Sequence, residues 1–391
     1  MKVYLDYVAT SPVKDEVKKA MMPYLTEIFG NPSSIHRWGQ EAKSAIEKAR
    51  GEVALFLGAK PQEIIFTSGG TEADNLAVRG ISNSKVHIIT TQIEHHAILK
   101  TCEDLEKNNI AEVTYLKPNR EGLISALQVK KALKKNTVLV SVMYVNNEIG
   151  TVQPIREIGK MIEKENKNRL SKERIYFHTD AVQAVEYLNV NVDFLHVDLL
   201  TLSGHKIGAT KGIGALYLRS GTPFEKIIFG GEQEMNLRAG TENVSGIVSL
   251  GKAIELIQIK NKKSNLKIKE LRDYFIKKII TEIPEVELNG SRQFRSPNNA
   301  NFYFKYVEGE SILLSLDLVG IAASSGSACT SLSLKPSHVL MATYDDAERS
   351  HGSIRFTLGQ ETTKEEIDYT ISNLKTIIKR LREISPLGST K

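Results

Sequence analysis

The first candidate for a reactive residue in this sequence is a lysine that follows a strand-like run. Lys206 ends the sequence Ser203-Gly204-His205-Lys206, and a glycine-rich stretch follows it. Burial lowers the pKa of a lysine, and the neutral amine can then form a Schiff base with an aldehyde. A solvated loop lysine is the plainer interpretation, because most lysines lie on protein surfaces.

A second motif provides a cradle for a phosphate group. The strand-like run at residues 63–67 leads into Gly69 and Gly70, and a helix is expected to begin at Thr71. Glycines allow close backbone approach, and the first helical turn offers free N–H groups and a positive dipole end. The motif is neither a Walker A loop nor G-x-G-x-x-G, so ATP and NAD are not indicated. A plain turn capped by the threonine is the alternative.

Two further motifs could contact a flat heteroaromatic ring. Asp180 stands at the end of a strand-like run, where a carboxylate could pair with a protonated pyridine nitrogen; a helix N-cap is the alternative. His95, in Glu94-His95-His96, could stack on the ring, and a polar loop pair is the alternative. Adjacent histidines rarely bind one ion, and no Cys or Asp cluster accompanies them, so no metal is expected.

The last two motifs contain a thiol and a guanidinium. Cys329 lies in a run of small polar residues (324–331) that is typical of an exposed, mobile loop, and mobility suits a nucleophile that must reach more than one place. An inert surface thiol is the alternative. Arg355 lies in an apolar strand-like run, where either a substrate carboxylate or an internal acid could pair with it.

Each motif is a weak signal alone, but together they describe one cofactor. A phosphate cradle, an amine, an acid for a ring nitrogen, a stacking imidazole and a guanidinium for a carboxylate suit pyridoxal 5'-phosphate acting on an amino acid. The sequence therefore predicts pyridoxal 5'-phosphate.

Strand-like and helical patterns alternate between about residues 60 and 220. This alternation predicts an α/β fold whose large domain has a mostly parallel seven-stranded sheet flanked by helices. The last two runs have no helix between them and could pair antiparallel. The expected strands are residues 63–67, 86–90, 113–116, 138–145, 175–178, 193–201 and 214–218.

The pattern changes after about residue 245. A long helix at 246–280 leads into a shorter α+β pattern, which predicts a smaller α+β C-terminal domain. We expect residues 15–255 to form the large domain that binds the cofactor. Residues 1–14 and 256–391 are expected to form the small domain that carries the cysteine loop.

Composition narrows the class of protein. The 391 residues are 41% hydrophobic and 25% charged, as in a folded globular protein, and no apolar run could span a membrane. The net charge of +6 suits an anionic ligand, but it is smaller than the clustered positive charge that is typical of a nucleic-acid-binding protein. Two distant cysteines exclude a disulfide scaffold. The N-terminus has no apolar signal segment, so a cytoplasmic protein is expected.

The chain resembles cysteine desulfurases of the NifS/IscS type, within the class V aminotransferase-like, fold-type I pyridoxal-phosphate enzymes. The similarity covers nearly the whole chain in the family's order. The stretches that carry it include YLDYVAT (4–10), FTSGGTEADN (66–75), EHHAIL (94–99), VNNEIG (145–150), HTDAVQ (178–183), SGHK (203–206), RAGTEN (238–243), SSGSACTS (324–331) and SIRFTLG (353–359).

This resemblance implies a role for each matching residue. Lys206 would hold the cofactor covalently and move the substrate's Cα proton, and His95 would stack on the ring. The ring nitrogen and ring hydroxyl would contact Asp180 and Gln183. The phosphate would be held by Gly70, Thr71, Ser203 and His205, together with Thr241 from the second subunit of a homodimer. Asn147, beside the cofactor, and Arg355 would hold the substrate carboxylate.

The implied reaction converts L-cysteine to L-alanine. Cys329 would attack the substrate sulfur and keep it as a persulfide for an iron–sulfur scaffold protein or another sulfur acceptor. A selenocysteine lyase or a class V aminotransferase is the alternative enzyme. A sulfur-relay or scaffold-binding protein without activity is the remaining alternative, and Lys206, Asp180 and His95 speak against it.

Overall fold

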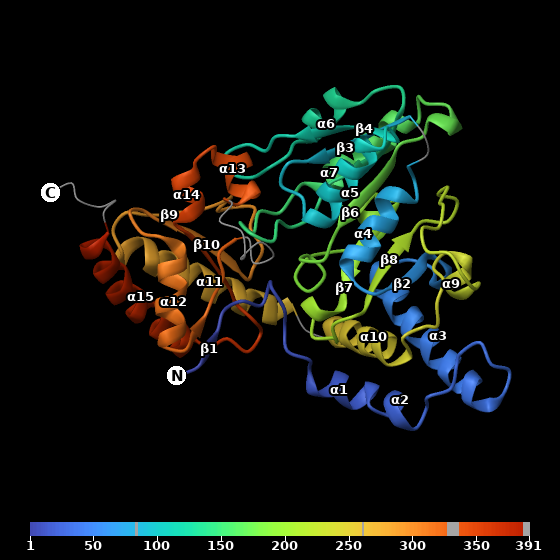
Figure 1. The fold of residues 1–391 in the computed structure, drawn as a ribbon, viewed down its shortest axis with the longest axis horizontal. Coiled ribbons are helices and arrows are strands. Elements are labelled where there is room, and N and C mark those ends of the chain that lie inside the picture. Colours follow the sequence, from blue (N-terminus) through green and yellow to red (C-terminus); the bar gives the residue numbers. More distant parts are fainter. Residues whose placement is uncertain (83–84, 260–261, 327–335, 386–391) are drawn as a thin grey trace.

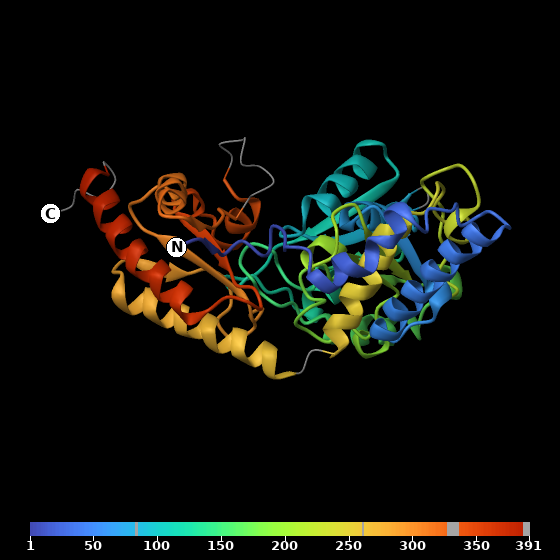
Figure 2. The same ribbon diagram turned by 90° about the horizontal axis from the view of Figure 1, so that it is seen from below.

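The protein consists of two parts that lie side by side (Figures 1 and 2). The computed structural model describes residues 1–82, 85–259, 262–326 and 336–385, the side chains of 262–264 excepted. The larger part contains a seven-stranded sheet, the smaller part a three-stranded sheet, and a two-stranded pair joins the N-terminus to the smaller part. None of the described helices has the length and apolar character that crossing a bilayer demands.

The seven-stranded sheet is mostly parallel, which confirms the predicted fold class. Only β8 runs antiparallel to its neighbours, and it pairs with both β2 and β7. The antiparallel pair expected from the last two strand-like runs is therefore present. In spatial order the strands are β2 (Ile64–Thr67), β8 (Gly214–Leu218), β7 (Leu199–Ser203), β6 (Tyr176–Asp180), β5 (Thr137–Ser141), β3 (Val86–Thr91) and β4 (Ala111–Leu116).

Helices cover both faces of this sheet, which explains why its central strands are buried. All residues of β3, β7 and β8 are buried. One core packs α3, α7 and α10 against the sheet, and a second packs α4 and α5 against its other face. The α-helices of this part are α1 (Asp15–Met21), α2 (Pro23–Thr26), α3 (Arg37–Leu57), α4 (Gly70–Arg79), α5 (His96–Lys107), α6 (Ala126–Ala132), α7 (Ile155–Asn166), α8 (Val192–Leu195), α9 (Gln233–Asn236) and α10 (Val244–Ile259).

Two expected strands were too long. The run at 138–145 leaves the strand after Ser141, although the backbone N–H groups of Val142 and Tyr144 still donate to β6. The run at 193–201 begins as a helix, because the side chain of Asn191 caps α8 by accepting from the N–H of Phe194. The strand itself starts only at Leu199.

The smaller part is an antiparallel sheet packed against long helices. Its strands are β9 (Val286–Leu288), β10 (Asn299–Phe304) and β12 (Ser353–Thr357). Its helices are α11 (Lys262–Glu282), α12 (Gly309–Leu318), α13 (His338–Tyr344), α14 (Ala347–His351) and α15 (Lys364–Ile384). The single helix expected at 246–280 was wrong, because this stretch is divided between α10 and α11.

The N-terminus belongs to the smaller part and then crosses to the larger one. Strand β1 (Val3–Tyr4) pairs in parallel with β11 (Ile321–Ala322), and Asp6 bridges to Thr357 on β12. The following residues reach η3 (Gly204–Lys206) in the larger part, and Figure 2 shows this crossing segment between the two halves. The proposed division of the chain at residues 14/15 and 255/256 stays a prediction.

A cluster of phenylalanines should dominate the stability of the smaller part. The ring of Phe302 is fully buried and contacts Phe275 edge-to-face, with ring centroids 5.5 Å apart. Phe302→Ala should lower the free energy of unfolding by about 3–5 kcal/mol, measured by denaturant titration. Phe294→Ala is the control, because that side chain is 49% exposed. Equal stability of the two variants would contradict this assignment of the core.

Candidate active site

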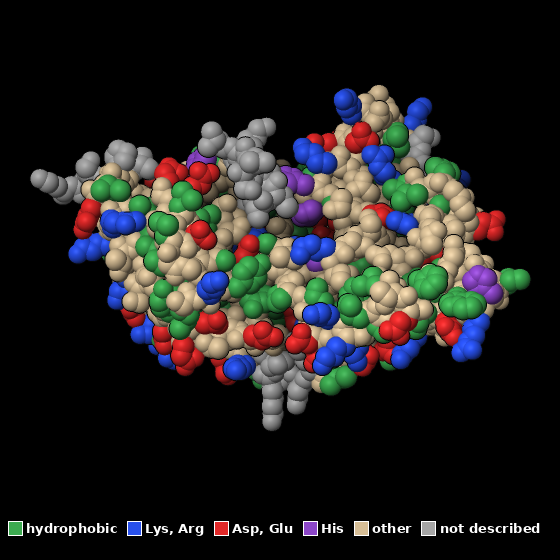
Figure 3. All heavy atoms as spheres, turned by 60° about the horizontal axis from the view of Figure 1, so that its bottom comes forward, with side chains coloured by type: hydrophobic (Ala, Val, Ile, Leu, Met, Phe, Trp, Pro, Cys, Tyr) green, Lys and Arg blue, Asp and Glu red, His purple; other side chains and the backbone are tan. Residues whose placement is uncertain are grey.

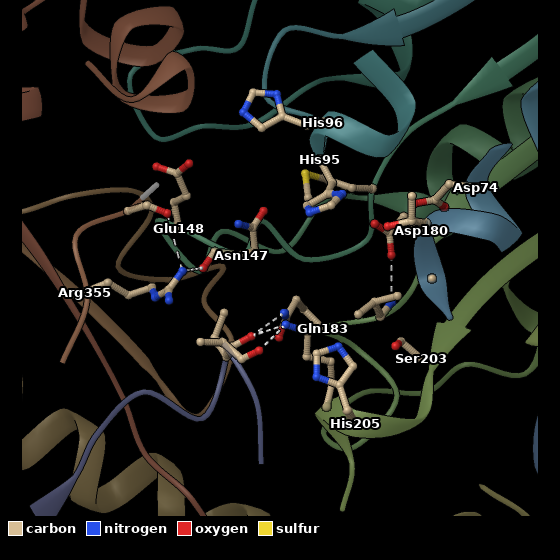
Figure 4. A pocket seen from close by; sticks show the side chains of 18 of the residues that line it. Asp74, His95, His96, Asn147, Glu148, Asp180, Gln183, Ser203, His205 and Arg355 are labelled. Carbon is tan, nitrogen blue, oxygen red and sulfur yellow. Dashed lines mark hydrogen bonds between the residues drawn. The ribbon is translucent and has the colours of Figure 1, made fainter. Parts of the chain in front are cut away.

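Ten of the twelve residues expected in the site line one cavity. Its volume is about 430 Å³, and it lies between the carboxyl ends of the strands, the N-terminal segment and the smaller part. Figure 4 shows these side chains converging from both parts of the molecule. The ten are Gly70, Thr71, His95, Asn147, Asp180, Gln183, Ser203, His205, Lys206 and Arg355.

The two other expected residues are Thr241 and Cys329. Thr241 is exposed and does not line the cavity. Cys329 lies outside the described residues. The other cysteine, Cys102, is buried on α5, and burial raises the pKa of its thiol to about 12, so it is an inert core residue.

The amine of Lys206 is held by the N-terminal segment rather than by solvent alone. The residue lies in η3, directly after β7, and is half-buried. Its Nζ donates to the backbone oxygens of Val8 and Ala9, each at 2.7 Å. Gln183 contacts the same N-terminal segment, because its Nε2 donates to the oxygen of Val8. No motif in the sequence predicted that these two carbonyls would hold the amine.

The start of α4 leaves N–H groups directed at the cavity. The first N–H groups of a helix have no acceptor within it, and here Gly69 at the N-cap has no side chain that could supply one. The helix begins at Gly70, one residue before the expected start at Thr71, so the alternative of a turn capped by the threonine is wrong. Gly69 has φ +154°, which favours glycine. A Cβ on Gly70 would lie 3.1 Å from Val182, so the backbone packs closely at the cavity wall.

Asp180 and a second buried acid, Asp74, lie together in the cavity (Figure 4). Asp180 accepts from the N–H of Val182 at 2.8 Å within a turn, and no helix begins there, so it is not a helix N-cap. Burial raises the pKa of Asp180 to about 6. Burial, then the charge of Asp180, raises the pKa of Asp74 well above its usual range.

Asp74 was not among the residues predicted from the sequence. Its Oδ1 has no hydrogen-bond partner among the described residues and lies 3.8 Å from Nε2 of His178. The signal was available, because Asp74 stands one helical turn after Gly70 and therefore shares its face of α4.

The ring of His95 is neutral and lies beside Lys206. His95 is the N-cap of α5, and its Nδ1 accepts from the N–H of Ala97 at 3.1 Å. Burial, reinforced by the charge of Lys206, lowers the pKa of His95 to about 4. Because Nδ1 accepts a hydrogen bond, the proton of the neutral ring is on Nε2. The imidazole is thus fixed at the cavity wall.

Arg355 makes the internal ion pair that was left open as an alternative. It is 2% exposed on β12, and its Nη2 donates to Oδ1 of Asp6 at 2.8 Å. Its Nη1 donates to the oxygen of Asn147 at 3.1 Å. The Nε atom has no hydrogen-bond partner among the described residues, so the guanidinium keeps a donor beside the cavity. An incoming carboxylate would meet a guanidinium that is already oriented.

These groups could together hold a planar, phosphorylated aldehyde. The start of α4 would face the phosphate, the imidazole and carboxylate of His95 and Asp180 would face a ring, and Lys206 would face the aldehyde. The guanidinium is left for a substrate carboxylate.

The comparisons with known proteins agree with this fold. Residues 3–370 match the family model of aminotransferase class-V. "Cysteine desulfurase IscS" of Dictyoglomus turgidum is 54% identical, with 98% of this chain and 96% of that protein covered. The solved structure of a "NifS-like protein" has a TM-score of 0.90 and 33% identity, with 97% of this chain and 100% of that one covered. The chain therefore belongs to the class-V aminotransferase family and, within it, to the cysteine desulfurases.

The buried carboxylate of Asp180 should make the stability of the cofactor-free protein depend on pH. Its folded pKa is about 6, above that of an unfolded aspartate, so its ionisation disfavours the folded state as the pH rises from about 4 to 6. Asp180→Asn should therefore be more stable than wild type by about 2–3 kcal/mol above pH 6. The gain should shrink as the pH falls towards 4.

Denaturant titrations at pH 4.5 and 8 measure this difference. Asp317→Asn is the matched control, because that side chain is exposed on α12. A gain for Asp180→Asn that is equal at both pH values would contradict the assignment.

Proposed function

We propose that this chain is a pyridoxal 5'-phosphate-dependent cysteine desulfurase that converts L-cysteine to L-alanine and passes the sulfur on. The observation that carries the proposal is the single cavity shared by the Lys206 amine, the Asp180 carboxylate and the Arg355 guanidinium. A similar solved structure, "SspA in complex with cysteine", has a TM-score of 0.81 and 37% identity, with 93% of this chain and 100% of that one covered. It supports L-cysteine as the substrate.

The donor set fits pyridoxal 5'-phosphate. The N–H groups of Gly70 and Thr71, with Ser203 and His205, would hold the phosphate. Burial raises the pKa of both Asp180 and Asp74, so this carboxyl pair retains a proton. A pyridine nitrogen that enters the site could accept a hydrogen bond from that proton or take it up. When bound, the cofactor supplies an electron sink for the bonds at the substrate's Cα.

The protein's own residues would bind and orient the substrate. Arg355, oriented by Asp6, would bind the carboxylate together with Asn147. Lys206 would take the Cα proton on Nζ, and the carbonyls of Val8 and Ala9 would keep that atom in position. His95 would cover the cofactor ring and exclude water from it.

Sulfur transfer would use Cys329. Its thiolate sulfur would form a bond to Sγ of the substrate while the Cβ–Sγ bond breaks. The electron pair of that bond would return to carbon, which takes up a proton to become the methyl group of L-alanine. The persulfide left on Cys329 would then pass to an iron–sulfur scaffold protein or another sulfur acceptor.

Cys329→Ala should lower the release of alanine and sulfide from L-cysteine by roughly a hundredfold or more. Cys102→Ala is the control, because that thiol is buried on α5 and should leave turnover unchanged. Coupled assays of alanine and sulfide measure both variants.

Other outcomes would point to the alternative functions. Full turnover of L-cysteine by Cys329→Ala would contradict the persulfide step. Intact turnover of selenocysteine in that variant would favour a selenocysteine lyase. A wild-type protein that binds no cofactor would support a relay or scaffold-binding protein.

We also propose a homodimer in which Thr241 reaches the partner's phosphate site. Large apolar side chains of the segment between α2 and α3 are exposed, with Phe29 at 71% and Ile35 at 95%. Phe229 is 78% exposed in the segment that leads to Thr241. A patch of this kind is typical of a surface that a second copy covers.

Charge placed in this patch should separate the subunits. Wild type should show twice the 43.5 kDa of one chain by light scattering, and Ile35→Asp should shift the mass towards one chain at low concentration. Leu318→Asp makes the same change on α12, where the side chain is 85% exposed, and should leave the dimer intact. A wild-type mass of one chain would contradict the proposal.

A further inference from the structure

Two histidines of the cavity have no part in the functions proposed so far. His96 is the first residue of α5 in the larger part, and His338 is the first residue of α13 in the smaller part. Both line the cavity, and their ring centroids lie 4.5 Å apart with 39° between the ring planes. Figure 3 shows histidine side chains gathered in the depression between the two parts.

The hydrogen bonds of this pair define which nitrogen atoms are available. Nε2 of His338 lies 2.9 Å from the backbone oxygen of Glu94, and because a carbonyl only accepts, Nε2 carries the proton. Nδ1 of His96 is buried and has no hydrogen-bond partner among the described residues. Burial, followed by the charges of His338 and Lys100, lowers the pKa of His96. The positive end of α5 acts in the same direction, so the ring is neutral.

The position of His96 matches the direction in which a substrate side chain would extend. Asn147 and Arg355 would hold the carboxylate on one wall, and the amine would face Lys206. Figure 4 shows His96 across the cavity from Gln183 and His205, on a different side from Arg355. An amino acid held by its carboxylate and its nitrogen therefore has this wall left for the substituent on Cβ.

We propose that His96 and His338 form the subsite for the sulfur of L-cysteine, with Nδ1 of His96 accepting a hydrogen bond from the substrate thiol. His338 is the positioning residue, because its ring packs against that of His96 and is tethered to the carbonyl of Glu94. The thiol of L-cysteine can donate a hydrogen bond to this nitrogen, whereas the methyl group of L-alanine cannot. The subsite thus favours substrate over product, and it rests on the proposed function.

Equilibrium binding in the Cys329→Ala background separates this subsite from turnover. The dissociation constants of L-cysteine and L-alanine are measured from the change in cofactor absorbance that each amino acid causes. His96→Phe keeps a ring but loses the acceptor, so it should raise the dissociation constant of L-cysteine about five- to tenfold. The affinity for L-alanine should stay within about twofold. His96→Gln returns an acceptor and should recover part of the loss.

His351→Phe is the matched control, because this histidine is exposed at the end of α14. If His96→Phe does not fold, as judged by circular dichroism, His96→Ala replaces it in the same comparison. An equal loss of affinity for both amino acids, or no loss of affinity for L-cysteine, would overturn the proposed subsite. A wild-type protein that releases no alanine from L-cysteine would instead overturn the proposed function.

Discussion

The charged groups of the cavity need hydrogen-bond or ion-pair partners within the protein, because burial separates them from bulk water. Two nitrogens of Arg355 donate to Asp6 and to the carbonyl of Asn147, and Lys206 donates to two carbonyls of the N-terminal segment. Removing one member would leave the other charge buried and unpaired, which costs more than the pair contributes. The chemistry of the site therefore depends on residues 6–9, which come from outside the larger part.

The sequence patterns that predicted the fold are those that burial imposes locally. Short, largely apolar runs marked all seven strands of the large sheet, because helices cover both of its faces. The failures also have local causes. Asn191 caps a short helix inside an expected strand, and the helical pattern after residue 245 hid the division between α10 and α11.

The site was predictable where a motif stands at the end of a strand, as for Asp180 and Lys206. It was not predictable where contacts join distant parts of the chain. Asp6 and Arg355 are 349 positions apart, and His96 meets His338 only because α5 of the larger part and α13 of the smaller part both begin at the same cavity. No pattern along the sequence encodes such a meeting, since it follows from how the two parts pack together.

The parallel pairing of β1 with β11 has a consequence for synthesis on the ribosome. Val3 is among the first residues made, but its partner Ile321 emerges only after more than three quarters of the chain. The larger part can collapse around its sheet during translation, as N-terminal units generally do. The N-terminal segment that tethers Lys206 can be held in place only after β11 has been translated. The reactive pocket is therefore completed last, close to the release of the chain.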